Sequence, residues 1–498
     1  MVIELRTEGK VLGSANENWL KVFMKVMQKL GHDEIIINPV ADPSFLPLAT
    51  QIYLKLEAFF GGTSKWQTVQ SVLDHKKIDL IIDLTSTPVK NPNIKTLAPA
   101  FNGCLGQRGL IFALLENGNP EVSIFDVNTN EVLSAGKASL EAANATPGAM
   151  AAIYSRIPVL IEKALKSRSS KSLHSIKPVQ APSPKKLTKS AIKLAIKSIV
   201  RAVYERLCRV PYWHVGYRFA DEAITKTMSL DGPVWRVLEC PGNRFYADPV
   251  PVNWQGQYYL FFEDFEYTSK KGVISVVSFD ENGNPKNPPQ IALEEEWHLS
   301  YPFLFESKGE IFMIPEGSAS GRIDIYKADN FPLGWKRHAT LIENIEAADV
   351  TIYRQKDKLW LFAVTRNCEG GYSDTLSIFH ADDLFGPWVP HTQNPVLIDP
   401  AKARPAGNMF EHDGKLFRPV QDCSTVYGGQ IHIMEVTALD AGMFQQSVFT
   451  TLKAGKKWPG RKLHTLNCSG KLETIDGTIV RPRLLVLAKI LGKIFKPK

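Results

Sequence analysis

The feature that most constrains the fold is a two-strand phrase that recurs in the second half of the chain. It reads ADPVPVNWQGQYYLFFED from Ala247, SYPFLFESKGEIFMIPEG from Ser300 and ADVTIYRQKDKLWLFAVT from Ala348. It returns as AGNMFEHDGKLFRPVQD from Ala406 and, more loosely, as LHTLNCSGKLETIDG from Leu463. Each copy is an alternating apolar strand, a polar turn and a second aromatic strand. Five units at intervals of roughly 50 residues predict a five-bladed β-propeller over residues 213–480, because a β-sandwich would not repeat one phrase at this period.

Residues 1–165 have a different texture. Apolar runs such as EIIINP and KKIDLIIDLT are separated by the helical pattern NENWLKVFMKVMQKLGH. Short apolar strands that alternate with amphipathic helices are typical of a doubly wound α/β domain with a Rossmann-type sheet. The run EVSIFDVNTNEVLSAG predicts two strands around an Asn-rich turn, followed by a helix to about Leu165.

Residues 166–212 predict a basic linker followed by an amphipathic helix. The linker is rich in Ser, Pro and Lys, and Leu187, Ile192, Ile196 and Ile199 can then share one helix side. The tail, 481–498, can likewise place four apolar residues opposite its lysines. The formal net charge is +8 for the whole chain, yet both segments are strongly basic, so the two folded domains are acidic. Solvated helices and contact with an anionic membrane surface both explain the two basic segments.

Several classes of protein are disfavoured. The six cysteines are scattered without a C-x-x-C pair, which argues against a disulfide framework or a zinc site. The first residues are too polar for a secretory signal, and no apolar run is long enough to cross a bilayer. The charge is not interleaved with aromatics on a folded face, so no nucleic-acid partner is expected. We therefore expect a cytoplasmic protein, with peripheral contact at the inner face of the membrane left open.

The candidate site residues come from equivalent places in the repeats. The first strand of a propeller blade lines the axis, so residues at its start converge. Acids brought together in this way repel one another unless a ligand, a cation or a shared proton holds them. For each residue a turn, a cap or a hydrogen bond within one blade is the alternative role. The candidates are Asp248, Tyr301, Asp349, Arg404 and His464 from first strands, Glu316 and Asp422 from second strands, and Arg244, His298, Arg418, Tyr427 and Asn467 nearby.

The phrases RFYADP, HLSYPFLFE, MIPEG, DVTIY, RPAG and HTLN resemble the propeller at the N-terminus of glucosamine inositolphosphorylceramide transferases. That propeller is similar to the five-bladed furanosidase superfamily. The resemblance implies that Asp248 is the base or nucleophile and that Asp349 orients the acid. The family's general acid opens the fourth blade, where this chain has RPAG, so Glu316 is the candidate substitute. An Arg at that place favours a phosphate-bearing leaving group, contacted by Arg404 and His464, and hence a transferase.

The first domain resembles the formyltransferase-like α/β domain that is fused to this propeller in bacterial proteins. The family's N-x-H loop corresponds to FNGCLG, in which Asn102 is present but Cys104 replaces the His. The later Asp is replaced by Glu131 in NTNEVLSAG. These departures make formyl transfer improbable, and no dinucleotide or P-loop motif is present.

The sequence thus predicts a carbohydrate-active enzyme, a glycosyltransferase of surface-glycan or glycolipid assembly that uses an activated sugar donor. The alternatives are a furanoside or pentoside hydrolase, a non-catalytic glycan-binding module and a residual formyltransferase. No cofactor is evident and no metal ligands are assigned, but dependence on a divalent ion stays undecided. The expected partners are a carbohydrate or glycolipid substrate and, as an open alternative, an anionic membrane surface.

Overall fold

A computed structural model describes most of the chain. The residues described are 1–8, 10–14, 19–40, 46–61, 64–69, 77–141, 143, 145–166, 171–172, 176–177, 180–366, 370–455, 458 and 460–483. The chain divides into two compact units. The first unit is Met1–Tyr204 with the short segment Asn367–Gly371. The second unit is Glu205–Arg366 with Tyr372–Lys498. The amphipathic helix predicted for the tail over 484–498 lies outside the described residues.

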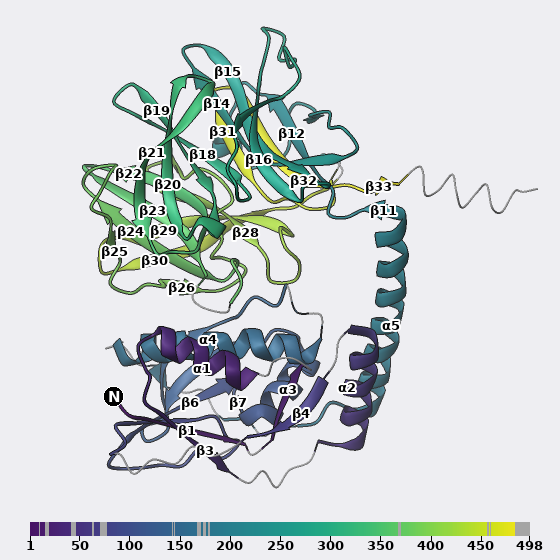
Figure 1. The fold of residues 1–498 in the computed structure, drawn as a ribbon, viewed down its shortest axis with the longest axis vertical. Helices are drawn as coiled ribbons and strands as arrows, with labels where there is room; N and C mark the ends of the chain where they lie inside the picture. The colour runs from purple at the N-terminus through teal and green to yellow at the C-terminus, as the bar shows by residue number, and fades with distance from the viewer. Residues whose placement is uncertain are drawn as a thin grey trace, which may run out of the picture. The chain divides into compact units, whose positions relative to one another are not determined.

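The first unit is an α/β domain built on a mixed eight-stranded sheet of order β10-β9-β8-β6-β5-β1-β3, with β7 beside β6 (Figure 1). Strands β3, β1, β5 and β6 are parallel, whereas β8 and β9 continue the sheet antiparallel. The two strands predicted around the Asn-rich turn are confirmed as the antiparallel hairpin of β8 and β9. The strands are β1 (Ile3–Glu8), β3 (Ile35–Val40), β5 (Leu80–Asp83), β6 (Lys95–Phe101), β7 (Cys104–Leu105), β8 (Val122–Asp126), β9 (Glu131–Gly136) and β10 (Lys171–Ser172), with a separate pair β2 (Lys10–Ser14) and β4 (Ser64–Thr68).

Helices of this unit pack on the sheet and on one another. Helix α4 contacts β8, β9 and α1, and α3 contacts β6 and β7. Trp19 of α1 stacks on Tyr154 of α4 with ring centroids 3.8 Å apart, which locks the two helices together. The helices are α1 (Trp19–Lys29), α2 (Leu48–Gly61), α3 (Gly106–Asn117), α4 (Thr146–Lys166) and the long α5 (Pro184–Leu207).

The second unit is a five-bladed β-propeller, as the repeat predicts (Figure 1). Four blades run in chain order from the innermost strand outward. They are β14 (Arg244–Trp254) to β17 (Gln290–Leu293), β18 (Ser300–Ser307) to β21 (Leu333–Glu343), β22 (Ala347–Gln355) to β25 (Val389–Pro390), and β27 (Phe410–His412) to β30 (Phe444–Leu452). Between these lie β15 (Gln257–Glu266), β16 (Lys271–Ser278), β19 (Glu310–Glu316), β20 (Arg322–Asn330), β23 (Lys358–Thr365), β24 (Thr375–Ala381), β28 (Lys415–Asp422) and β29 (Gln430–Leu439), while β26 (Leu397–Ile398) pairs with β24.

The fifth blade joins the two ends of the propeller sequence. Strands β31 (Leu466–Ser469) and β32 (Leu472–Thr478) pair with β12 (Trp213–Phe219), and β13 (Arg236–Val237) completes the sheet. A second short pair joins β11 (Cys208–Arg209) to β33 (Arg481–Pro482). The last copy of the phrase fits the repeat loosely because half of its blade comes from a segment more than 200 residues earlier in the chain. This pairing closes the ring and leaves no open edge at the seam.

The innermost strands of the first three blades share one irregularity. Asp248, Tyr301 and Asp349 each have a positive φ, of 51°, 40° and 52°, and each lies at a register shift in its blade's first hairpin. A β-bulge re-aims the side chain at the extra residue, and a left-handed conformation costs about 1–3 kcal/mol for a residue other than glycine. The same cost recurs at three equivalent positions, so the arrangement belongs to the repeat rather than to one turn.

In the fourth blade a glycine, Gly407, lies near the position that corresponds to these bulge residues. We expect its substitution to destabilise the fold strongly. Gly407 has φ 146°, and an added Cβ would lie 1.9 Å from the carbonyl oxygen of Leu466. We expect Gly407→Ala to lower the free energy of unfolding by about 3 kcal/mol or more, because both the backbone and the blade contact are strained. Urea unfolding measures this. Gly455→Ala, whose nearest atom would lie at 4.0 Å, is the matched control, and equal stability of the two variants would contradict the prediction.

Candidate functional site

Polar side chains from several blades meet at the innermost strands of the propeller. We call this group the axial cluster. It consists of Asp248, Glu263, Glu316, Asp349, Arg404, Tyr427, His464 and Asp476. Most of its side chains are buried, so their contacts with one another decide their chemistry.

His464 holds the first half of the cluster. Its Nδ1 lies 3.0 Å from Oδ2 of Asp476 and 3.1 Å from Oδ1 of Asp248, and its Nε2 lies 2.7 Å from the hydroxyl of Tyr427. Asp476 also accepts hydrogen bonds from the backbone N–H groups of Asp248, at 2.9 Å, and of Thr465, at 2.8 Å. Burial alone would lower the pKa of His464, but the two carboxylates raise it to about 10. At neutral pH the imidazole is therefore a cation between two acids.

Arg404 holds the second half. Its Nε donates to Oδ2 of Asp349 at 2.6 Å and its Nη2 to Oδ1 at 3.2 Å, which is a bidentate pair. Gln421 donates to the same Oδ2 at 2.9 Å. Glu316 lies 3.6 Å from Nη2 of Arg404, and the remaining Nη1 donates to the carbonyl oxygen of Tyr372. Arg404 therefore neutralises acids of its own protein.

Tyr427 connects the two halves. Its hydroxyl is bonded to His464, and the guanidinium of Arg404 lies 5.0 Å from its ring centroid. Asp248 and Asp349 therefore belong to one continuous set of contacts, although they come from different blades. The sequence placed Tyr427 near these phrases but gave it no role.

Two glutamates of the cluster favour the protonated form. Burial, and next the charge of Asp349, raise the pKa of Glu316 well above its ordinary value. Burial, and next the charge of Asp248, do the same for the pKa of Glu263. A protonated carboxyl group can donate its proton, whereas an ionised one can accept, so the cluster is suited to acid–base chemistry.

Glu263 was missed by the sequence analysis. It pairs with Ala247 across the first hairpin of its blade, as Glu316 pairs with Ser300 in the next blade. Each stands fifteen residues after its bulge residue, Asp248 or Tyr301. An alignment of the second strands by this fifteen-residue interval would have identified Glu263. In the sequence Glu263 lies within the acidic run FFEDFE, which resembles an ordinary strand end.

One oxygen of Asp248 has no hydrogen-bond donor. Oδ1 is buried, has no hydrogen-bond partner and lies 3.1 Å from Nδ1 of His464. Nδ1 instead bonds Asp476. Buried polar atoms are rarely left without a partner, so this oxygen is suited to accept a proton or a hydrogen bond from a ligand.

Two further predicted residues border the cluster. Nε2 of His298 lies 3.4 Å from Glu263, and its Nδ1 accepts the backbone N–H of Gly272. Tyr301 is buried, and its hydroxyl bonds Thr351 at 3.0 Å. Burial, and next the charge of Asp349, raise the pKa of Tyr301, so it stays a neutral donor.

The structure places four other predicted residues outside the cluster. Arg244 pairs with Asp264 at 2.8 Å. Arg418 donates to the carbonyl oxygens of residues 402 and 403, which braces the fourth blade. Asp422 caps the turn at the end of β28 by accepting from the backbone and side chain of Ser424. Asn467 bridges Asn408 and Pro249. Arg244, Arg418 and Asp422 bond nearby segments of the chain, whereas Asn467 joins the fifth blade to segments of the fourth and first blades.

A metal ion has one candidate location in the described residues. Ligand atoms of Asp248, His464 and Asp476 all lie within 4.8 Å of one another. A metal-bound imidazole nitrogen carries no proton, so an ion at Nδ1 of His464 would displace the proton that the two carboxylates favour there. Carboxylates and imidazole are ligands that divalent ions use in proteins, so a proton and a divalent ion are alternative occupants of this position.

The charge of His464 predicts a pH dependence of stability. Its pKa rises from 6.5 to about 10 in the folded protein, so the native state binds the extra proton between these values. The stabilisation is complete below about pH 6.5 and is lost as the pH rises towards 10. We expect the free energy of unfolding, measured by urea titration, to fall across this window. His412→Gln should leave that slope unchanged, and a flat profile in the wild-type protein would contradict the assignment.

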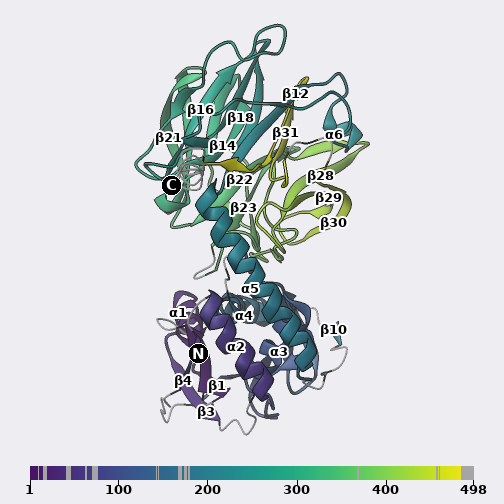
Figure 2. The same cartoon turned by 90° about the vertical axis from the view of Figure 1, so that its right-hand side faces the viewer.

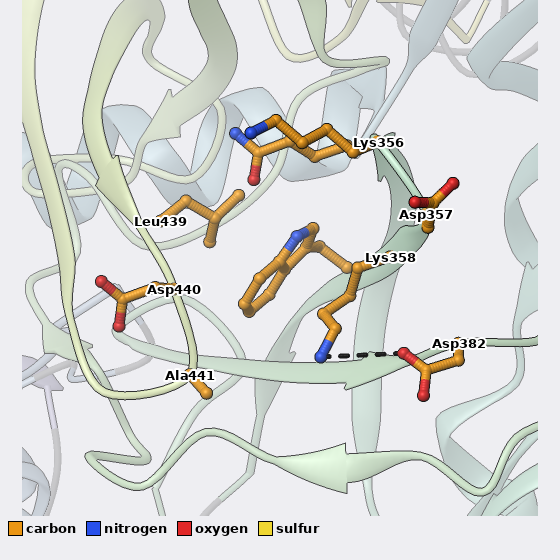
Figure 3. A pocket seen from close by; sticks show the side chains of 9 residues that line it. Lys356, Asp357, Lys358, Asp382, Leu439, Asp440 and Ala441 are labelled. Carbon is orange, nitrogen blue, oxygen red and sulfur yellow. Dashed lines mark ion pairs between the residues drawn. The ribbon is translucent and has the colours of Figure 1, made fainter.

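Two hollows lie away from the cluster. A groove of about 470 Å³ is lined by residues 355–358, Trp360, Asp382 and residues 439–441, and Lys358 pairs with Asp382 across one side of it (Figure 3). A smaller one of about 220 Å³ lies beside Phe312 and Phe385. Neither is lined by a residue that the sequence proposed for the site.

The first unit offers little support for a formyl-transfer site. Asn102 has φ 50° in a tight turn, and its side-chain oxygen accepts the backbone N–H of Glu121 at 3.0 Å. Burial raises the pKa of the Cys104 thiol, which makes it a poorer nucleophile. Glu131 is exposed at the start of β9. The resemblance to formyltransferases stays a prediction.

Comparison with known proteins bears on the propeller. Residues 237–476 match the family model described as glucosamine inositolphosphorylceramide transferase 1, N-terminal. The propeller resembles the N-terminal region of that transferase. The curated transferase of Arabidopsis thaliana is 30% identical over 279 residues, which is 51% of this chain and 36% of the relative. That of Oryza sativa subsp. japonica is 31% identical over 256 residues, 48% and 33% of the two chains. The chain spans about a third of the length of these relatives.

Solved structures align with part of this chain at low identity and low TM-score. A family 117 glycoside hydrolase of Zobellia galactanivorans is 12% identical with a TM-score of 0.35, over 58% of this chain and 99% of that one. An α-L-arabinofuranosidase of Podospora anserina is 12% identical with a TM-score of 0.34, over 50% and 94%.

Proposed function

We propose that this protein is a carbohydrate-active enzyme that transfers a glycosyl group in surface-glycan or glycolipid assembly, with its site at the axial cluster. The observation that carries the proposal is the donor-free oxygen of Asp248 in the same network as Glu316, a glutamate whose pKa burial and the charge of Asp349 raise. The similarity of residues 237–476 to a protein named as a glycosyltransferase supports the reaction class. The name of that relative suggests an inositolphosphoryl lipid as the acceptor class.

The proposed step needs one base and one acid. Asp248 Oδ1 takes the proton of the acceptor hydroxyl as the acceptor oxygen bonds the anomeric carbon. The bond from that carbon to the leaving oxygen breaks, and Glu316 gives its proton to the leaving oxygen. Asp349 helps to keep Glu316 protonated, since its charge raises the pKa of Glu316. His464 and Arg404 are positioning residues that hold the two aspartates.

The contacts of Arg404 and His464 bear on their predicted role as contacts for the leaving group, which stays a prediction. Both were candidate contacts for a phosphate leaving group, but Arg404 is paired with Asp349 and His464 with two carboxylates. The protein's own carboxylates already neutralise both cations of the cluster. A leaving group that takes a proton from Glu316 therefore suits the site better than a bare phosphate.

Glycoside hydrolysis is the second candidate. It is favoured by the same pairing of a protonated glutamate with an aspartate that can accept a proton, if water takes the place of the acceptor hydroxyl. The glycan-binding module and the formyltransferase gain no comparable observation from the cluster.

One experiment separates these functions. The full chain is incubated with p-nitrophenyl furanosides and pyranosides and with nucleotide sugars, each with and without an inositol phospholipid, in ¹⁸O-labelled water. Mass spectrometry of the products is expected to show a glycosylated lipid that carries no label. Labelled free sugar alone would assign hydrolysis. Glycan affinity in calorimetry without product from any donor would overturn both enzymatic proposals in favour of binding.

A further inference from the structure

Helix α5 presents an apolar stripe that stays exposed among the residues that the structure describes. Its first turn is fixed to the first unit, since Leu187 is buried and Lys186 donates to the carbonyl oxygen of Glu116 at 2.9 Å. Further along the helix, whose course Figure 2 shows, five aliphatic side chains are exposed by half or more of their surface. They are Ile192 at 57%, Ile196 at 57%, Ile199 at 61%, Val200 at 60% and Val203 at 51%.

These five residues form one continuous face. Their spacing of four, three, one and three residues keeps them on the same side of a helix with 3.6 residues per turn. Ala191, Leu194, Ala195 and Ser198, on the other side of the helix, are only partly exposed, so the helix has a packed side as well. A contiguous exposed patch of branched aliphatics marks a surface that contacts something apolar.

The charge beside the stripe indicates what that contact is. Lys189, Lys193 and Lys197 are exposed. They are spaced four residues apart and lie along one edge of the stripe. The helix contains one acidic residue, Glu205, near its end. A basic flank beside an apolar face fits the headgroup region of an anionic bilayer, where lysines meet lipid charge and the aliphatic side chains enter the acyl boundary.

Two other occupants fit less well. A second copy of the same helix would bring like charges together, which destabilises the contact. A nucleic acid would be expected to use aromatic side chains for stacking, whereas this stripe is made of isoleucine and valine. In the described part of the chain, no helix has both the length and the apolar character needed to cross a bilayer. Contact along the membrane surface is the mode that the composition of α5 fits.

We propose that α5 is a docking site for an anionic membrane surface, with the stripe Ile192, Ile196, Ile199, Val200 and Val203 inserted and Lys189, Lys193 and Lys197 at the lipid headgroups. This inference stands on the helix alone and does not depend on the chemistry at the propeller axis.

Vesicle flotation of the full chain tests it. Vesicles of phosphatidylcholine with about one-third phosphatidylglycerol should bind the protein, with affinity falling steeply as salt rises, while pure phosphatidylcholine should bind it far more weakly. Replacement of Lys189, Lys193 and Lys197 by Gln should weaken binding about 100-fold. The matched control replaces Lys226, Lys308 and Lys336, exposed lysines of the propeller, and should bind like the wild type.

A second variant separates the stripe from the charge. Ile192→Ser, Ile196→Ser and Ile199→Ser together keep every lysine, and circular dichroism and the melting temperature verify that the protein still folds. This variant should also lose vesicle binding. Equal binding to neutral and anionic vesicles, full binding by the lysine variant, or self-association that the serine variant abolishes would each overturn the proposal.

Discussion

Replacing Asp248 by Asn is expected to lower glycosyl turnover by about 10²–10⁴-fold while the protein remains folded. The amide cannot accept the proton of an acceptor hydroxyl, and general base catalysis is typically worth a factor of this size. Asn is among the residues that best tolerate a positive φ, so the bulge at φ 51° should persist. The turnover number and KM, measured with any donor that the wild type accepts, give the result.

The matched control for this variant is Asp221→Asn. Asp221 lies in the same unit, and its side chain is 92% exposed in a surface pair with Lys471. Its loss should leave the turnover unchanged. If Asp248→Asn keeps wild-type turnover, Asp248 is not the base and the catalytic assignment at the axis fails. If both variants lose activity together with their melting transitions, the effect lies in folding.

Replacing Arg404 by Met should have the largest effect on stability. Asp349 is 1% exposed and would keep Gln421 as a hydrogen-bond donor while losing both bonds from the guanidinium. Removal of one partner of a buried ion pair typically costs about 3–5 kcal/mol, because the other charge stays buried without compensation. Urea unfolding followed by tryptophan fluorescence measures the loss.

A double variant and a surface pair test the cause. Arg404→Met with Asp349→Asn removes the stranded charge, so it should recover a large part of the lost stability. Lys336→Met breaks an exposed pair with Asp329 and should cost less than about 1 kcal/mol. If Arg404→Met were as mild as Lys336→Met, Asp349 would not depend on Arg404 for its charge balance.

The repeat pattern specifies the propeller and several of its central residues. The alternating phrases predict five blades, and the equivalence of Asp248, Tyr301 and Asp349 appears in the structure as three bulges with the same φ sign. Equivalence along a repeat can be found from sequence because each blade meets the axis in the same way. The pattern did not separate residues such as Arg418 and Asp422, which stand near the same phrases but bond within one blade.

The local sequence thus determined the blades, the turns and the residues that start each inner strand, because hydrophobic period and turn chemistry act over a few residues. Tertiary structure decided the rest. Closure of the ring by β12 and β32, the pairing of Arg404 with Asp349, and the proton held by His464 all join segments that are far apart in the chain. Burial and the distances between charges set these contacts and pKa values, and both quantities exist only once the blades are assembled.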